Sequence, residues 1–327
     1  MKLPIYLLAL TSAFLHAQGG SLTPPPGSPA PTMKSLDQVE ARTPLIEGAT
    51  GVSITPGSGN ITINQSGSYY LAGNLTVTGG NAITITANFV TLDLNGFTIT
   101  SNAEPASGNG IFILGSDVTI SRGNITGSYD VQENSGTGFG TGIKSTEDGP
   151  IEIQHVKVSN CAGDGINIGR YADNFNTVTS CFVRNVEGAG IIAVTVERCG
   201  VKNTGGDGID CDSALHCKVS TDNGIGIKGD LISHCRSHSY GTHGIKGLLV
   251  NNSMGGTYHG TGIEGQAVSH CFGSSSEGTS IRGTKLVTFS DTYYGGNIMG
   301  GHFAISAPMA VGCPDGIHLI TNEFLMP

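Results

Sequence analysis

Apolar residues recur at intervals of 18 positions through the C-terminal half of this chain. One column is Ile191, Ile209, Ile227, Ile245, Ile263, Ile281, Met299 and Ile317. Five residues further on, another column is Val196, Ala214, Ile232, Val250, Val268 and Leu286. A short fixed period with aligned apolar positions is typical of a solenoid, in which each coil buries its apolar side only against its neighbours. The chain is therefore constrained to a stack of short, similar coils.

Glycine indicates that these coils consist of strands and tight turns. It precedes most of the isoleucines, and the phrase Gly-x-Gly-Ile recurs less regularly upstream, where it ends at Ile111, Ile143 and Ile166. The chain has 51 glycines in 327 residues and only 13% charged residues, yet its hydrophobic share of 38% is too high for a disordered chain. A left-handed β-helix has apolar residues about every six positions, whereas here they fall at 0, +5 and +8. We predict an all-β fold, a right-handed parallel β-helix solenoid with coils of about 18 residues.

The N-terminal segment has the order of an export signal. Residues 1–17 hold Lys2, then an apolar run from Ile5 to Leu15, and they end in the small residue Ala17. The run is too short to span a bilayer, and no later stretch is long and apolar enough for a transmembrane helix. We predict a secreted protein, or one of the periplasm or cell surface, whose mature chain begins with a Pro/Gly/Ser-rich linker at residues 18–32.

Residues 33–58 are expected to lead into the solenoid, and residues 59–327 to form the parallel β-helix. A short capping helix is predicted from Met33 to Leu45, because Ser35 can cap its N-terminus and Pro44 can end it. We expect this helix to cover the open end of the first coil.

Three features resemble bacterial secreted proteins with right-handed parallel β-helix repeats. They are the segments Gly67–Val77 and Val90–Ile99 and the coils in which Gly-x-Gly-Ile is followed by His-Cys. The resemblance covers nearly all of the mature chain. It implies the fold of the pectate-lyase-like superfamily, and that fold by itself does not specify an activity.

Five cysteines are expected to form a ladder on the inner side of the coils. They are Cys181, Cys199, Cys217, Cys235 and Cys271, and Cys161 is assigned to the equivalent place in a longer coil. Side chains stacked at the strand spacing of about 4.8 Å lie too far apart for a disulfide, so we predict buried free thiols. Disulfides are the alternative, since export exposes cysteines to oxidation. No cysteine spacing matches a zinc motif, and the identity of any metal stays open.

A row of charged residues is predicted on one outer face of the stack. The candidate catalytic residues on it are Asp210, Asp212, Lys228, Asp230, Lys246, Glu264 and Arg282. Polysaccharide lyases on this fold need such a set of side chains. A Lys or Arg acts as the base, and acidic groups or calcium neutralise the carboxylate of a uronate. A pair of carboxylates could instead hydrolyse a glycosidic bond. Calcium is the candidate cofactor, and the structural alternative is that opposite charges pair across coils.

Two insertions interrupt the repeat, at Thr126–Thr141 and Arg170–Thr177. Their aromatic residues can give a sugar ring an apolar platform, while their charged residues can hydrogen-bond its hydroxyl groups. Loops of unusual composition are good places to look for ligand contacts. The candidate ligand-binding residues are Tyr129, Asp130, Arg170 and Tyr171.

The sequence favours a glycan-binding or structural role at the cell surface. The alternative is a polysaccharide lyase or glycoside hydrolase that acts on uronate-containing polymers. The expected partner is a polysaccharide or cell-surface glycan, because a formal net charge of −9 argues against nucleic acid. The apolar ending Glu323–Pro327 also offers a strand edge through which two chains could associate.

Overall fold

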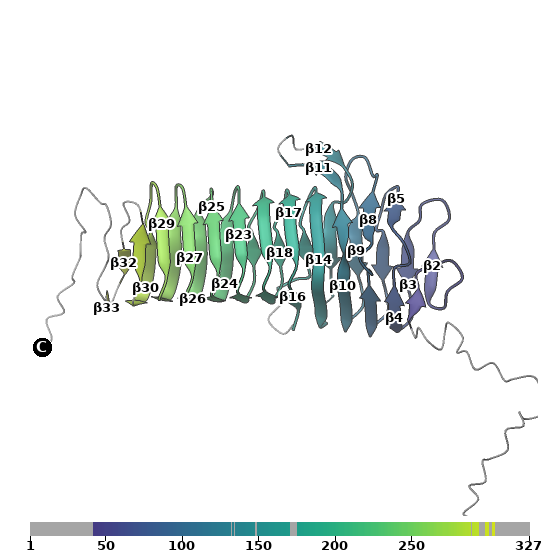
Figure 1. Ribbon diagram of the computed structural model, residues 1–327, viewed down its shortest axis with the longest axis horizontal. Coiled ribbons are helices and arrows are strands. Elements are labelled where there is room, and N and C mark those ends of the chain that lie inside the picture. Colours follow the sequence, from purple (N-terminus) through teal and green to yellow (C-terminus); the bar gives the residue numbers. More distant parts are fainter. Residues whose placement is uncertain are drawn as a thin grey trace, which may run out of the picture. The chain divides into compact units, whose positions relative to one another are not determined.

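The computed structural model describes residues 42–304, except 132, 134, 148, 171–174, 289, 294–297 and 301–302. Within this part of the chain there are strands and turns and no helix. Almost all strands pair in parallel with the equivalent strand of the next coil, and the coils follow one another in a row (Figure 1). The expected right-handed parallel β-helix is confirmed.

Each coil contributes to three faces, which we call faces A, B and C in chain order. Face A carries the isoleucine column. It consists of β3 (Ile61–Ile63), β6 (Ile83–Ile85), β9 (Asn109–Ile113), β13 (Thr141–Ser145), β15 (Ile166–Asn167), β18 (Ile191–Ile192), β21 (Ile209–Asp210) and β32 (Ile298–Gly300). Face B consists of β1 (Thr43–Pro44), β4 (Gly67–Tyr70), β7 (Val90–Asp93), β16 (Thr177–Thr179), β19 (Thr195–Glu197), β22 (Ser213–Leu215) and β33 (Phe303–Ala304).

Face C completes the coil. It consists of β5 (Leu75–Val77), β8 (Thr98–Ser101), β17 (Phe182–Val186), β20 (Gly200–Thr204), β23 (Lys218–Thr221), β25 (Arg236–Ser239), β27 (Met254–Thr257), β29 (Phe272–Ser275) and β31 (Asp291–Tyr293). Longer strands continue from face B into face C, namely β10 (Val118–Thr126) and β14 (Ile151–Cys161). Others continue from face A into face B, namely β24 (Ile225–Ser233), β26 (His243–Asn251), β28 (Thr261–Ser269) and β30 (Ile281–Thr288).

The 18-residue register holds from Ile191 to Ile281 and then changes. In the coil that begins with Ile281, one extra residue bulges out between Gly283 and Leu286. Val268 therefore pairs with Val287 instead of Leu286. Val287 is buried and Leu286 is 41% exposed, so the expectation that Leu286 points inward is wrong. The next coil is one residue short, which places Ile298 rather than Met299 beside Ile281.

The first coil is closed by strands. Thr43 and Pro44 form β1, which pairs with β4, so the predicted helix does not extend to Leu45. An antiparallel strand, β2 (Val52–Ile54), pairs with β3 at the start of face A. Residues 33–41, the expected signal peptide and linker, and the ending Glu323–Pro327 lie outside the described residues. Among the residues described, no helix is long and apolar enough to cross a membrane.

The corner between faces B and C has a left-handed backbone in most coils. It is occupied by Arg122, His155, Ser180, Arg198, His216, His234, Asn252 and His270, whose φ angles lie between 47° and 58°. This conformation costs an L-residue about 1–2 kcal/mol. It turns the chain so that the following residue points into the core, and the predicted cysteine ladder occupies that following position.

The ladder cysteines are buried free thiols, as predicted. Their sulfur atoms also accept hydrogen bonds, because the backbone N–H of Cys217 donates to Cys235 Sγ at 3.4 Å and that of Cys181 donates to Cys199 Sγ at the same distance. The assignment of Cys161 to this ladder is wrong: it pairs with Val186, and Val156 holds the ladder position in that coil. Burial raises the pKa of the Cys161 thiol to about 12, so it stays protonated.

A buried carboxylate ties the first coils together. Asp93 is 3% exposed and pairs with both Arg42 and Arg122, and it accepts a hydrogen bond from the Asn95 amide at 2.8 Å. Burial alone would raise the pKa of Asp93, but the hydrogen bonds from Asn95, Arg122 and Arg42 outweigh it and lower that pKa. A depressed folded-state pKa stabilises the fold above the unfolded value of about 3.9. This stabilisation is lost as the pH falls through the folded-state pKa.

We therefore expect Asp93→Asn to lower the free energy of unfolding by about 1.5 kcal/mol at pH 7 and by progressively less as the pH is lowered through the folded-state pKa of Asp93. Urea unfolding of wild type and variant across this range measures the difference. A difference that stays constant with pH contradicts the assigned role of the Asp93 carboxylate.

Candidate functional site

The insertion after β15 is fixed at its C-terminal end by one buried amide. Asn176 is fully buried just before β16, and its Nδ2 donates to the Ile168 carbonyl at 2.6 Å. Its Oδ1 accepts from the Ile151 amide at 3.0 Å, and its carbonyl accepts from the Thr195 amide at 2.9 Å. These bonds join three consecutive coils, so the backbone beside Asn176 is held in place.

Arg170 fixes the start of the same insertion. Its guanidinium pairs with Asp210 at 2.7 Å, with Asp230 at 3.3 Å and with Asp212. Burial alone would lower the pKa of Arg170, but the carboxylates of Asp212 and Asp210 outweigh it and raise that pKa. The candidate ligand-binding residue Arg170 and three candidate catalytic aspartates thus form a single ion cluster, which sequence reasoning had placed in two separate sites.

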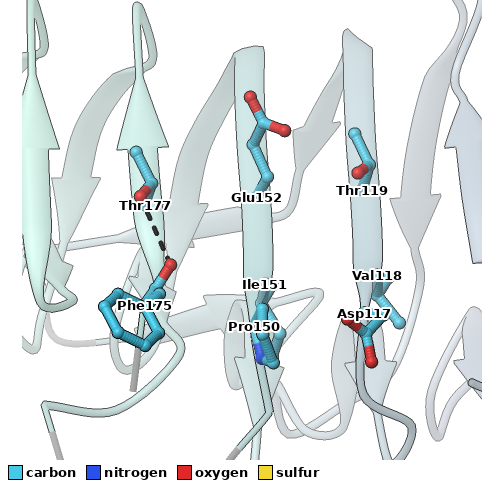
Figure 2. A pocket seen from close by; sticks show the side chains of 8 residues that line it. All are labelled: Asp117, Val118, Thr119, Pro150, Ile151, Glu152, Phe175 and Thr177. Carbon is cyan, nitrogen blue, oxygen red and sulfur yellow. Dashed lines mark hydrogen bonds between the residues drawn. The ribbon is translucent and has the colours of Figure 1, made fainter. Parts of the chain in front are cut away.

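Phe175 lies directly before the buried Asn176. Its side chain is 82% exposed although its neighbour Asn176 is fully buried. It lies on a shallow cavity of about 320 Å³ between faces A and B, shown in Figure 2. The cavity is lined by Asp117, Val118, Thr119, Pro150, Ile151, Glu152, Phe175 and Thr177.

The polar groups of this cavity come from neighbouring coils in register. Thr119 on β10 pairs with Glu152 on β14, and Glu152 pairs with Thr177 on β16. The three outward side chains therefore form a row of hydroxyl, carboxylate and hydroxyl groups, and the Phe175 ring lies below the Thr177 end of this row (Figure 2). Asp117 adds a second carboxylate where β10 begins. The Phe175 carbonyl accepts a hydrogen bond from Thr177 Oγ1 at 3.4 Å. An apolar ring next to groups that bind hydroxyls suits a sugar.

The charged row on face A is present, and its opposite charges pair across coils. Lys228 Nζ lies 3.1 Å from Asp210, and Lys246 Nζ lies 3.1 Å from Glu264. Arg282 reaches the same Glu264 at 3.3 Å. Burial would raise the pKa of Glu264, but its bonds with Lys246 and the nearby His243 lower it. All seven candidate catalytic residues thus take part in ion pairs, as the structural alternative requires.

His243 belongs to this charged row but was absent from the candidate residues. Its Nε2 lies 3.4 Å from Glu264, and its buried Nδ1 has no hydrogen-bond partner among the described residues. Burial lowers the pKa of His243, and the charges of Lys246 and Arg282 lower it further, against the opposing effect of Glu264. Strand alternation alone would direct position 243 to the same side as the buried Ile245, so the sequence carries no clear signal for its place beside Glu264.

Calcium does not fit the residues that the structure describes. Asp210, Asp212 and Asp230 each contact a different nitrogen of Arg170. No group of three His, Cys, Asp or Glu side chains in the described part of the chain is arranged to hold a metal ion.

The two insertions leave the coils at different corners. Tyr129 and Asp130 lie on β11 (Ser128–Asp130), which pairs with β12 (Ser135–Thr137) in a hairpin that connects face C to face A. The second insertion connects face A to face B, so the structure does not place Tyr129 and Asp130 with Arg170. Tyr171 lies outside the described residues.

Comparison with known proteins finds similarity to solved structures only. No family model and no curated protein matches the sequence. The enzymatically active domain of tailspike protein 2 from bacteriophage CBA120 is similar to this chain, with 17% identity and a TM-score of 0.28, over 76% of this chain and 42% of that one. The full-length tailspike protein 2 of an Escherichia coli O157:H7 bacteriophage is similar with 14% identity and a TM-score of 0.25, over 76% and 38%. This chain spans less than half the length of either tailspike chain.

Proposed function

We propose that this protein is exported and binds a polysaccharide through the cavity beside Phe175. The observation that carries the proposal is a phenylalanine, 82% exposed, that lines a shallow cavity together with two carboxylates and two hydroxyl groups. Phe175 is the most exposed of the large apolar side chains among the described residues. A sugar is complementary to this cavity. Its apolar C–H face can pack on the phenylalanine ring, and its hydroxyl groups can hydrogen-bond to the polar row.

The anchoring contributes to affinity. Asn176, the residue after Phe175, is fully buried and hydrogen-bonded to Ile168, Ile151 and Thr195, so less conformational freedom is lost when a ligand binds. The carboxylates of Asp117 and Glu152 also favour a class of sugar. They accept hydrogen bonds from hydroxyl or ammonium groups and repel the carboxylate of a uronate. We infer that this cavity takes a neutral sugar or an amino sugar.

The contacts of the charged row favour binding over uronate cleavage. A lyase base needs a lone pair directed at the proton it removes. The amino groups of Lys228 and Lys246 instead contact Asp210 and Glu264. Their positions are explained by pairing across coils without a catalytic role.

The test compares Phe175→Ala with wild type in affinity electrophoresis through gels that contain neutral, amino or uronate polysaccharides. We expect retardation by at least one neutral or amino polymer, and affinity about tenfold weaker in Phe175→Ala, because the stacking surface is lost. The matched control is Leu249→Ala, which removes another exposed apolar side chain, on β26. Equal retardation of Phe175→Ala and wild type contradicts the proposal, as does an equal loss in Leu249→Ala. Release of an unsaturated product from a uronate polymer would favour the lyase instead.

A further inference from the structure

Face C carries positive charge without negative charge over many consecutive coils. From the second half of β14 through β17, β20, β23, β25, β27 and β29, its strands contain no Asp or Glu. The same strands carry Lys157, Arg184, Lys202, Lys218 and Arg236. The whole chain has 25 acidic residues against 16 Lys and Arg, so this separation of charge runs against its composition.

These five cations are exposed, and none of them pairs with an acid in the part of the chain that the structure describes. The charged row on face A behaves differently, because Lys228, Lys246 and Arg282 all have carboxylate partners. Face C therefore leaves its positive charge available to a ligand.

The register places like charges directly opposite one another. Arg184 pairs with Lys202 on the next coil, and Lys218 pairs with Arg236. Neighbouring strands lie about 4.8 Å apart, and like charges at such positions destabilise a sheet. A bound anion would relieve this repulsion. The arrangement costs stability in the free protein, which favours a role in binding.

A cavity extends this surface toward the N-terminal coils. It measures about 410 Å³ and is lined by Gly96, Arg122, Gly123, Asn124, His155 and Lys157. Arg122 lies opposite the corner residue His155, and Asn124 pairs with Lys157. Lys157 is the cation of this hollow that has no acidic partner among the described residues, and Arg122, whose guanidinium pairs with Asp93, lies in the same lining. The hollow is large enough for one anionic sugar unit.

We propose that face C binds an acidic polysaccharide that carries carboxylate or sulfate groups. A chain lying along the stack would meet cations on successive coils, with one acidic unit in the cavity beside Lys157. Nucleic acid fits less well, because the net charge of −9 repels a duplex. The inference does not depend on the Phe175 cavity, which lies between the other two faces and carries negative charge.

The test measures binding of the purified protein to alginate, a polyuronate, over a range of salt concentrations. We expect Lys202→Gln/Lys218→Gln to bind about tenfold more weakly than wild type at low salt, and its slope of log affinity against log salt to be smaller by about two. The matched control is Lys144→Gln/Lys285→Gln, which removes the same charge from residues outside face C. This control and Phe175→Ala should both bind alginate like wild type. Because all four lysines are at least partly exposed, the variants are expected to fold.

Three outcomes overturn the proposal. The first is that wild type does not bind alginate at low salt. The second is that the two double variants lose the same affinity, since net charge alone would then explain the binding. The third is that duplex DNA binds wild type as tightly as alginate does, with the same dependence on Lys202 and Lys218. Loss of neutral-polymer binding in Phe175→Ala bears only on the Phe175 cavity, so the two proposals can fail separately.

Discussion

Gly208→Ala is expected to lower the free energy of unfolding by about 3 kcal/mol. Gly208 precedes Ile209 of the face A column, where the chain passes close to the next coil. A Cβ atom at this position would lie 2.3 Å from Val219 Cγ1 and 2.4 Å from the Gly226 carbonyl oxygen. The oxygen belongs to backbone that is paired on both sides, so it cannot rotate away as a flexible side chain could. This close packing explains why glycine precedes so many of the isoleucines.

Urea or thermal unfolding measures the effect, with Gly73→Ala as the matched control. A Cβ atom at Gly73 would meet no atom within 4 Å, so this variant is expected to unfold like wild type. A Gly208→Ala variant as stable as Gly73→Ala would show that the coils can separate to accept the methyl group, which the packing described above does not allow.

Cys235→Ala is expected to lower the free energy of unfolding by about 2 kcal/mol, whereas Cys235→Ser should change it much less. The buried Cys235 Sγ accepts a hydrogen bond from the Cys217 amide at 3.4 Å, and its thiol lies 3.2 Å from the Ser233 carbonyl. Alanine leaves the Cys217 amide buried without a partner. Serine can replace both bonds, since Ser253 accepts from the Cys235 amide at 3.1 Å in the next coil.

The same unfolding measurements distinguish two roles for the ladder. If Cys235→Ser is as damaging as Cys235→Ala, the thiol acts only as a small apolar group. If Cys235→Ser is close to wild type, the ladder position requires a hydrogen-bond acceptor, and the mixture of cysteine and serine in the column is explained.

The fold was predictable because a strict period records the register directly. From Ile191 to Ile281, position in the repeat alone says which side chains point inward. The prediction failed where the period changes, since one bulged residue before Leu286 exchanges the inward and outward positions. Cys161 was misassigned for a related reason, because its coil is longer and no count of 18 reaches it.

The candidate site was only partly predictable. The insertion that carries Phe175 could be identified because it interrupts the repeat. Asp117 and Glu152 could not be placed beside it, because they lie on coils of irregular length, where the sequence does not define the register. The contacts of Arg170 join positions 40 to 60 residues apart and depend on the path of the loop. The positive charge of face C could be predicted from the sequence, because the few residues after each ladder cysteine include no Asp or Glu.

A crystal structure of the protein with an oligosaccharide from the polymer that retards it would test the central proposal most directly. We predict a sugar ring stacked on the Phe175 side chain, with hydroxyl or amino groups hydrogen-bonded to Glu152 or Asp117. A sugar that binds elsewhere and leaves Phe175 in contact with solvent alone would contradict the proposal that this cavity is the binding site.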